Sequence, residues 1–139
     1  MACLCSSYGR AETITETSLK AFSYHLQELS YQSPDYLYPF LADDLIVEIN
    51  LGSNAQGVSM VFNKSEYMAR LKKKYPAKSY KENLKYLDVR SYDHVVTSPS
   101  SGRFSIVTYS RATRVKTWGV YDIEQQGDKL KIVKITEDM

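Results

Sequence analysis

Between residues 17 and 31 the hydrophobic residues recur at the spacing of a helix. They stand three, four and three positions apart, at Leu19, Phe22, Leu26 and Leu29. Because a helix turns by about 100° per residue, this spacing places them on one face. His25 lies on the flank of that stripe and Tyr24 on the opposite side. We therefore predict an amphipathic helix with a boundary histidine and an exposed tyrosine.

The next segment carries the signals of a second, short helix. Ser33 suits the N-cap, Pro34 the first helical position, and Asp35 places a negative charge in the first turn. Pro39 has no backbone N–H to donate, so we expect this helix to stay short.

Alternation then replaces the helical spacing. From residue 44 to 52, one side of the segment carries Leu45, Val47, Ile49 and Leu51, which predicts a strand. Gly52 and Gly57 predict a turn into a second strand at 58–62, so that the two strands form a hairpin.

A third helix is predicted from residue 63 to 75. Asn63 and Glu66 have the spacing of a variant capping box, and one side carries Tyr67, Met68, Leu71 and Tyr75.

The rest of the chain is rich in strand-forming residues. Strands are predicted at about 80–97, 103–113, 116–125 and 129–136, separated by turn residues at Pro99, Gly102 and Gly127. Such short connections predict an antiparallel meander.

This order of elements resembles the NTF2-like superfamily, including its SnoaL-like and ketosteroid-isomerase-like branches. The resemblance covers about residues 15–137 and is carried by SPDYLYPFLADDLIVEI (33–49) and TWGVYDIEQQGDKLKIVKI (117–135). Leu130 is a departure, because many relatives have tryptophan there. The resemblance implies an α+β cone, in which N-terminal helices pack in the concavity of a curved, mostly antiparallel sheet. It also implies a pocket inside the cone and often a dimer interface on the outer sheet face.

Asp93 and His94 are adjacent, but on a regular strand they point to opposite faces and cannot form a dyad unless a bulge intervenes. The face with Asp93 carries Leu87, Val89 and Val95 and is the more apolar, so we expect it to face inward and His94 outward. Burial would disfavour the charged form of Asp93 and make it a candidate general acid or base. The alternative is a structural role, with Asp93 bonded to a loop or an arginine near the strand end.

Aromatic residues are the other candidates for a site. The resemblance places five of them near the mouth of the cone or along its strands, where they could hold a flat apolar ligand: Tyr31, Tyr36, Phe40, Tyr109 and Trp118. Each could instead belong to the core or to a dimer interface. Between residues 104 and 109 both faces of the predicted strand are partly apolar, which suggests a homodimer through the outer sheet face.

The composition is that of a single domain. The 139 residues include twelve tyrosines, and no apolar run approaches the roughly 20 residues of a membrane span. Cys3 and Cys5 both precede the patterned part of the chain. We interpret residues 1–11 as a flexible tail or the remnant of a secretory signal peptide, and residues 12–139 as the domain. The second interpretation implies a secreted or periplasmic protein, and the first a cytoplasmic one.

Charge is distributed unevenly along the chain. Residues 1–63 contain two basic and seven acidic residues, whereas residues 64–139 contain sixteen basic and nine acidic ones. Many of the basic residues lie between Arg70 and Lys85, which is typical of a solvated helix face but could also bind an acidic partner. Basic and aromatic residues do not alternate as in RNA-binding motifs, so nucleic acid is not expected.

Three classes of function follow. The first is a small binding or interaction module, dimeric, with a pocket for an apolar or aromatic molecule. The second is a cofactor-independent isomerase, cyclase or dehydratase that uses Asp93 as general acid or base. The third is a protein-interaction module that uses the basic region from Arg70 to Lys85. Glycine-rich phosphate loops and zinc-type Cys/His spacings are missing from the sequence, so neither metal nor cofactor is expected.

Overall fold

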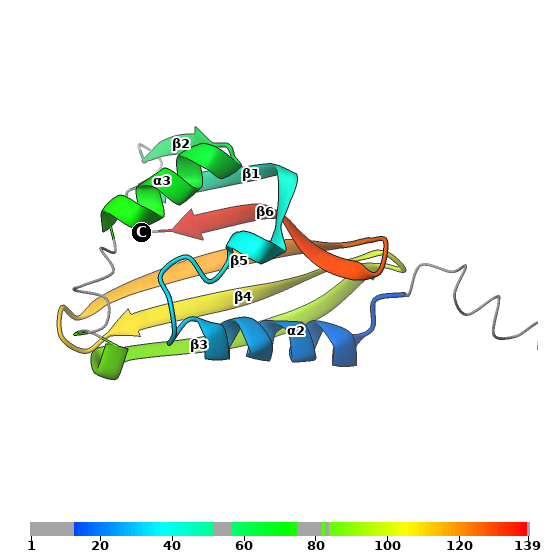
Figure 1. The fold of residues 1–139 in the computed structure, drawn as a ribbon, viewed down its shortest axis with the longest axis horizontal. Coiled ribbons are helices and arrows are strands. Elements are labelled where there is room, and N and C mark those ends of the chain that lie inside the picture. Colours follow the sequence, from blue (N-terminus) through cyan, green and yellow to red (C-terminus); the bar gives the residue numbers. More distant parts are fainter. Residues whose placement is uncertain (1–12, 52–56, 75–81, 83, 139) are drawn as a thin grey trace, which may run out of the picture.

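A curved sheet forms the frame of the molecule in the computed structural model (Figure 1). The structure describes residues 13–51, 57–74, 82 and 84–138, and within them six strands follow the order β2-β1-β6-β5-β4-β3. The strands are β1 (Leu41–Leu51), β2 (Val58–Phe62), β3 (Leu87–Ser98), β4 (Ser101–Ser110), β5 (Val115–Gln126) and β6 (Lys129–Asp138). β1 and β6 are parallel, and the other described neighbours are antiparallel. The predicted hairpin and meander are confirmed.

The first predicted helix is α2 (Glu16–Leu29), which lies along β3 (Figure 1). It begins after Thr15, whose hydroxyl accepts a hydrogen bond from the Ser18 backbone, so that one unpaired N–H of the first turn is satisfied. Leu19 and Leu26 are fully buried, whereas Tyr24 is exposed, as the helical spacing predicts.

The third predicted helix is α3 (Lys64–Lys74), which packs near β1 and β2 (Figure 1). The predicted capping box is confirmed: the Glu66 backbone donates to the Asn63 side chain, and the Asn63 backbone donates to the Glu66 carboxylate. Tyr67 and Met68 are buried. Tyr75, predicted on the same face, lies outside the described residues.

The predicted second helix is wrong. Residues 34–37 form turns, and only a 3-10 turn, η1 (Tyr38–Phe40), precedes β1. Its backbone bonds span three residues, from Tyr38 to Asp35 and from Phe40 to Leu37. Pro39 supplies no N–H in the middle of this stretch, so an α-helical ladder cannot extend through it. β1 accordingly begins at Leu41, three residues before the predicted strand.

The third predicted strand begins later than expected. Of the predicted range 80–97, the structure shows a 3-10 turn, η2 (Leu84–Tyr86), followed by β3 from Leu87. The predicted turn at 52–57 and the predicted tail at 1–11 fall mainly or wholly outside the described residues.

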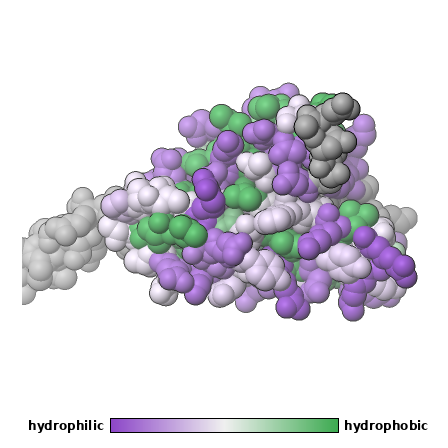
Figure 2. Space-filling model, turned by 180° about the vertical axis from the view of Figure 1, so that it is seen from behind, coloured by the Kyte–Doolittle hydropathy of each residue, from purple (hydrophilic) through white to green (hydrophobic). Residues whose placement is uncertain are grey.

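The core lies between the helices and the inner face of the sheet. In β1 the buried side chains of Leu45, Val47 and Ile49 alternate as predicted. In β4 and β5 the rings of Phe104 and Tyr121 stack with their centres 5.9 Å apart. From behind, hydrophobic side chains lie in several separate places among hydrophilic ones (Figure 2). Among the described residues, none of the helices has the length and apolar character needed to cross a membrane.

Candidate functional site

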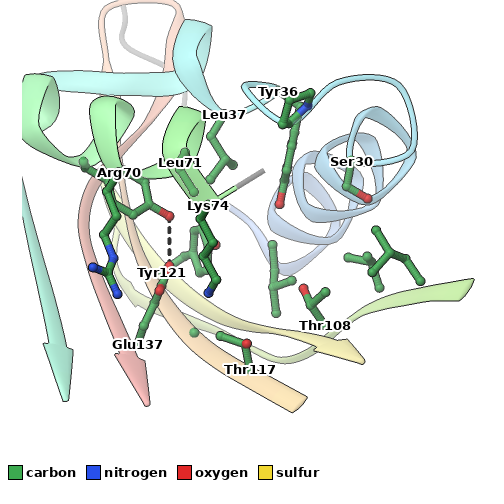
Figure 3. A pocket seen from close by; sticks show the side chains of 16 residues that line it. Ser30, Tyr36, Leu37, Arg70, Leu71, Lys74, Thr108, Thr117, Tyr121 and Glu137 are labelled. Atoms are coloured by element: carbon green, nitrogen blue, oxygen red, sulfur yellow. Dashed lines mark hydrogen bonds between the residues drawn. The ribbon is translucent and has the colours of Figure 1, made fainter. Parts of the chain in front are cut away.

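A pocket of about 80 Å³ lies inside the curve of the sheet, between the end of α2, the turn after it, and α3 (Figure 3). One water needs only about 10–15 Å³ by a similar measure, so several waters or a small ligand could be held. The apolar part of the wall is formed by Leu37, Leu71, Leu87, Val89 and Ile106. Hydroxyl groups are contributed by Ser30, Tyr36, Tyr67, Thr108, Thr117 and Tyr121.

Residues on the inner face of β4 and β5 form the floor of the pocket, because side chains alternate between the two faces of a strand. Ile106 pairs with Gly119 and Thr108 pairs with Thr117 across β4 and β5, so that these positions share the inner face. A Cβ at Gly119 would lie 2.8 Å from Cε1 of Tyr121. Glycine at this position therefore leaves room for the Tyr121 ring against the floor.

The buried Tyr67 and the half-buried Glu137 form a polar contact in the site. The Tyr67 hydroxyl donates to Oε1 of Glu137 at 2.8 Å, which is the dashed line in Figure 3. Burial, followed by the proximity of Tyr121 and Glu137, raises the pKa of Tyr67 well above its ordinary value. The phenol therefore stays protonated and serves as a hydrogen-bond donor that fixes the carboxylate.

Two cations stand beside this contact, one helical turn apart on α3. Lys74 is exposed as a whole residue, but its side chain extends along the pocket wall (Figure 3). Desolvation lowers the pKa of Lys74; Glu137 opposes the shift, and the charge of Arg70 adds to it. The Arg70 guanidinium lies 5.5 Å from the centre of the Phe62 ring, a cation–π contact that holds it near β2.

The structure brings only one of the five predicted aromatic residues into this pocket. Tyr36 lines it, with its ring pointing inward (Figure 3). Tyr31 instead accepts a hydrogen bond from the Val89 backbone at the edge of β3, at 3.0 Å. Phe40 packs edge-on against Phe22.

Tyr109 and Trp118 lie on the other side of the sheet. Their neighbours Thr108, Thr117 and Gly119 line the pocket, so strand alternation directs Tyr109 and Trp118 to the outer face. Trp118 is exposed there.

The predicted orientation of Asp93 and His94 is wrong. A bulge between Tyr92 and Val95 interrupts the pairing with β4, and Asp93 takes a left-handed backbone conformation with φ 56°. The extra residue shifts the alternation by one, so Asp93 is exposed and His94 turns toward α2. Asp93 therefore lacks the burial from which its catalytic role was inferred.

His94 takes part in a polar cluster beneath α2. Its Nε2 lies 2.7 Å from the hydroxyl of Ser23, which is fully buried and also 3.0 Å from the hydroxyl of Ser91. Its ring contacts that of Phe104 at 5.7 Å. Burial, reinforced by the charge of Lys20, lowers the pKa of His94, while Glu16 and Asp93 oppose the shift.

Sequence reasoning missed the ionisable residues of the pocket. Tyr67 was expected on the buried face of the third helix, where only its hydroxyl could have signalled a polar contact. Arg70 and Lys74 follow it at three and seven positions, which places them near the same face. Glu137 lies one residue beyond the predicted end of the last strand, whereas β6 continues to Asp138. In the described part of the chain, His, Cys, Asp and Glu form no cluster of three or more that could hold a metal ion.

Comparison with solved structures shows that the fold is NTF2-like. An NTF2-like protein of unknown function from Methylobacillus flagellatus KT is similar with a TM-score of 0.63, 8% identity, and coverage of 93% of this chain and 98% of that one. Another from Shewanella baltica OS155 has a TM-score of 0.64, 5% identity, and coverage of 89% and 95%. A third, from Shewanella oneidensis MR-1, has a TM-score of 0.59, 15% identity, and coverage of 84% and 95%.

Sequence comparison adds no closer relationship. No family model matches the chain, and no curated protein matches it in sequence. The structural similarity at these identities therefore shows the fold, which many unrelated functions share.

Proposed function

We propose that this protein is a small binding module that holds a partly apolar small molecule in the pocket between α2, α3 and the sheet. The observation that carries the proposal is the composition of the wall, in which leucine, valine and isoleucine side chains surround a few convergent polar groups. Such a combination is typical of ligand sites, because the apolar area supplies affinity and the polar groups fix orientation.

Nuclear magnetic resonance with a panel of small aromatic and aliphatic molecules tests this proposal. We expect at least one of them to shift the backbone signals of pocket residues such as Val89, Thr108 and Tyr121. Thr108→Phe should abolish these shifts because the ring occupies the pocket, whereas Thr136→Phe makes the same change on the outer face and should preserve them. A panel that leaves the pocket signals unmoved would contradict the proposal.

We further propose that the module is a homodimer through the outer sheet face. Trp118 and Tyr92 are exposed on this face by 48% and 47%, and Val107 pairs with Trp118 at its centre. Exposed aromatic residues around a half-buried aliphatic centre are typical of protein interfaces. Trp118→Glu should convert the dimer to a monomer in sedimentation velocity, whereas Tyr38→Glu on η1 should not. A wild-type monomer at micromolar concentration would refute this assignment.

The other two classes of function receive less support. The exposure of Asp93 removes the physical reason for an acid or base role. In the basic region from Arg70 to Lys85, Arg70 and Lys74 line the pocket, Lys72 and Lys73 are exposed, and residues 75–81 and 83 lie outside the described part. An acidic partner for that region stays a prediction.

A further inference from the structure

Glu137 brings to the pocket wall a carboxylate whose capacity for hydrogen bonds is only partly used. It pairs with Gly119, which pairs with Ile106, so the three positions form one row on the inner face of β6, β5 and β4. Its Oε1 accepts the hydrogen bond of Tyr67 at 2.8 Å, the one hydrogen bond to this carboxylate within the described part of the chain. An ionised carboxylate accepts up to about four hydrogen bonds and donates none. The wall therefore still offers acceptor sites to a group that donates.

Two threonine hydroxyls lie in the next row of the pocket floor. Thr108 and Thr117 pair directly across β4 and β5, and Thr117 stands two residues before Gly119, the partner of Glu137 (Figure 3). Thr117 and Glu137 are thus diagonal neighbours, whose Cα atoms lie about 7–8 Å apart in an antiparallel pair, so that one small group between them can contact both side chains. Both threonines are half-buried, and among the described residues neither hydroxyl has a hydrogen-bond partner.

An uncharged hydroxyl group of a ligand suits these partners. It can donate to Glu137 and accept from a threonine at the same time, because a hydroxyl both donates and accepts. An ammonium could also donate to Glu137, but it would lose the hydration of a full charge on entering a largely apolar pocket. Arg70 and Lys74 line the same pocket and take part in further interactions within the protein, such as that of Arg70 with Phe62, so the ligand class is not inferred from their charge.

We propose that the ligand of this pocket is an uncharged molecule with an apolar body and a hydroxyl group that donates to Glu137 and accepts from Thr117. The inference rests on the proposed function, since it names the ligand class for the same pocket. The apolar body of the ligand would contact Leu71, Val89 and Ile106, which form part of the apolar wall.

Benzyl alcohol and ethylbenzene are matched probes, because they have nearly the same shape and differ in one hydroxyl group. Water hydrates the alcohol more strongly, so the test compares the effect of each substitution on each probe. Both are titrated into the full chain and followed by the backbone amide signals of Val89 and Thr108. Glu137→Gln should weaken the binding of benzyl alcohol about tenfold, because an amide oxygen is a weaker acceptor than a carboxylate, and should leave ethylbenzene no weaker.

Thr117→Val removes the second partner and keeps the shape of the side chain. It should weaken benzyl alcohol by about two- to tenfold and leave ethylbenzene within about twofold. Glu48→Gln and Thr136→Val are the matched controls, since these two residues pair with each other across β1 and β6 on the outer face of the sheet. Either control should change both affinities by less than about twofold. Each variant is first compared with wild type by its amide spectrum, which verifies that it is folded.

The possible outcomes separate this inference from the proposal on which it rests. If both probes shift the pocket signals but Glu137→Gln and Thr117→Val leave benzyl alcohol unchanged, the ligand class is wrong and the binding function stands. Benzylamine places an ammonium at the position of the hydroxyl; if it binds more tightly than benzyl alcohol and loses this affinity in Glu137→Gln, the ligand is a cation and the inference is overturned. An effect of Glu48→Gln as large as that of Glu137→Gln would overturn the local assignment. If none of the three molecules shifts the pocket signals, the binding function itself fails.

Discussion

His94 occupies a place where the surrounding groups favour its neutral form. Burial against α2 and Phe104 removes water from the ring, and Lys20 adds a repulsive charge, so the pKa of His94 lies below that of an imidazole in the unfolded chain. Glu16 and Asp93 weaken this effect without reversing it. The unfolded chain therefore binds a proton at His94 at a higher pH than the folded protein does.

We expect the free energy of unfolding to fall as pH decreases through about 6.5, where the unfolded His94 gains its proton, and to level off once the folded ring is protonated as well. His94→Gln should flatten this dependence, because glutamine keeps a polar group near Ser23 and does not titrate. Urea denaturation of both proteins between pH 5 and pH 8 measures the difference. The same substitution at the other histidine, His25→Gln at an exposed position of α2, is the control and should keep the wild-type slope. An equal slope in His94→Gln and wild type would refute the assignment.

At the scale of the element, the bulge of β3 determines which side chains reach the core. Before the bulge, the odd-numbered residues Val89 and Ser91 lie on the inner face. After it, the even-numbered Val96 pairs with Gly102 on that face. The predicted alternation is therefore correct up to residue 92 and inverted beyond. The sequence SYDHVV contains no glycine and little to indicate a left-handed residue, although aspartate tolerates that conformation better than most. Two of the three predicted helices are confirmed, because the spacing of Leu19 and Leu26 and the pair Asn63 and Glu66 each have a local physical cause.

The left-handed conformation of Asp93 predicts an unusual order of stabilities. Asp93→Gly should equal or exceed the wild type, because glycine adopts φ 56° without strain, whereas Asp93→Val should lose about 1 kcal/mol or more. Asp88 lies on the same strand in regular pairing with Tyr109, so there valine should be more stable than glycine. Chemical denaturation of the four variants checks whether the order reverses between the two sites. If the valine variant were more stable than the glycine variant at both sites, residue 93 would have the ordinary backbone conformation of a strand.

At the scale of the whole molecule, the pocket depends on how distant segments meet. Its residues come from the C-cap and turn that follow α2, from α3 and from four strands. Ser30 and Glu137 are more than 100 residues apart in the sequence. The order of elements was sufficient to predict the fold. It could not predict that Tyr36, in the turn at 34–37, would point inward or that Tyr67 would meet Glu137, because these contacts follow from how the turn and α3 pack on the sheet.

The packing of helices on the sheet is tightly constrained where α2 meets β4. A Cβ at Gly102 would lie 2.5 Å from Cδ1 and 2.8 Å from Cδ2 of Leu19, which is fully buried and has little space to move. Gly102→Ala should therefore displace α2 from the sheet and lower the free energy of unfolding by about 1–3 kcal/mol. The same strand offers a control in Ser105→Ala, which adds no atom to the inner face.

A double-mutant cycle distinguishes this steric cause from a loss of strand stability. Leu19→Ala alone should cost about 2–5 kcal/mol, because it leaves a cavity under α2. If the clash with Leu19 is the cause, adding Gly102→Ala to Leu19→Ala should cost little or restore part of the loss, since the new methyl group enters the vacated space. Additive losses in urea denaturation would mean that Gly102 is required for the strand itself, and that the approach of α2 is not what limits this end of the sheet.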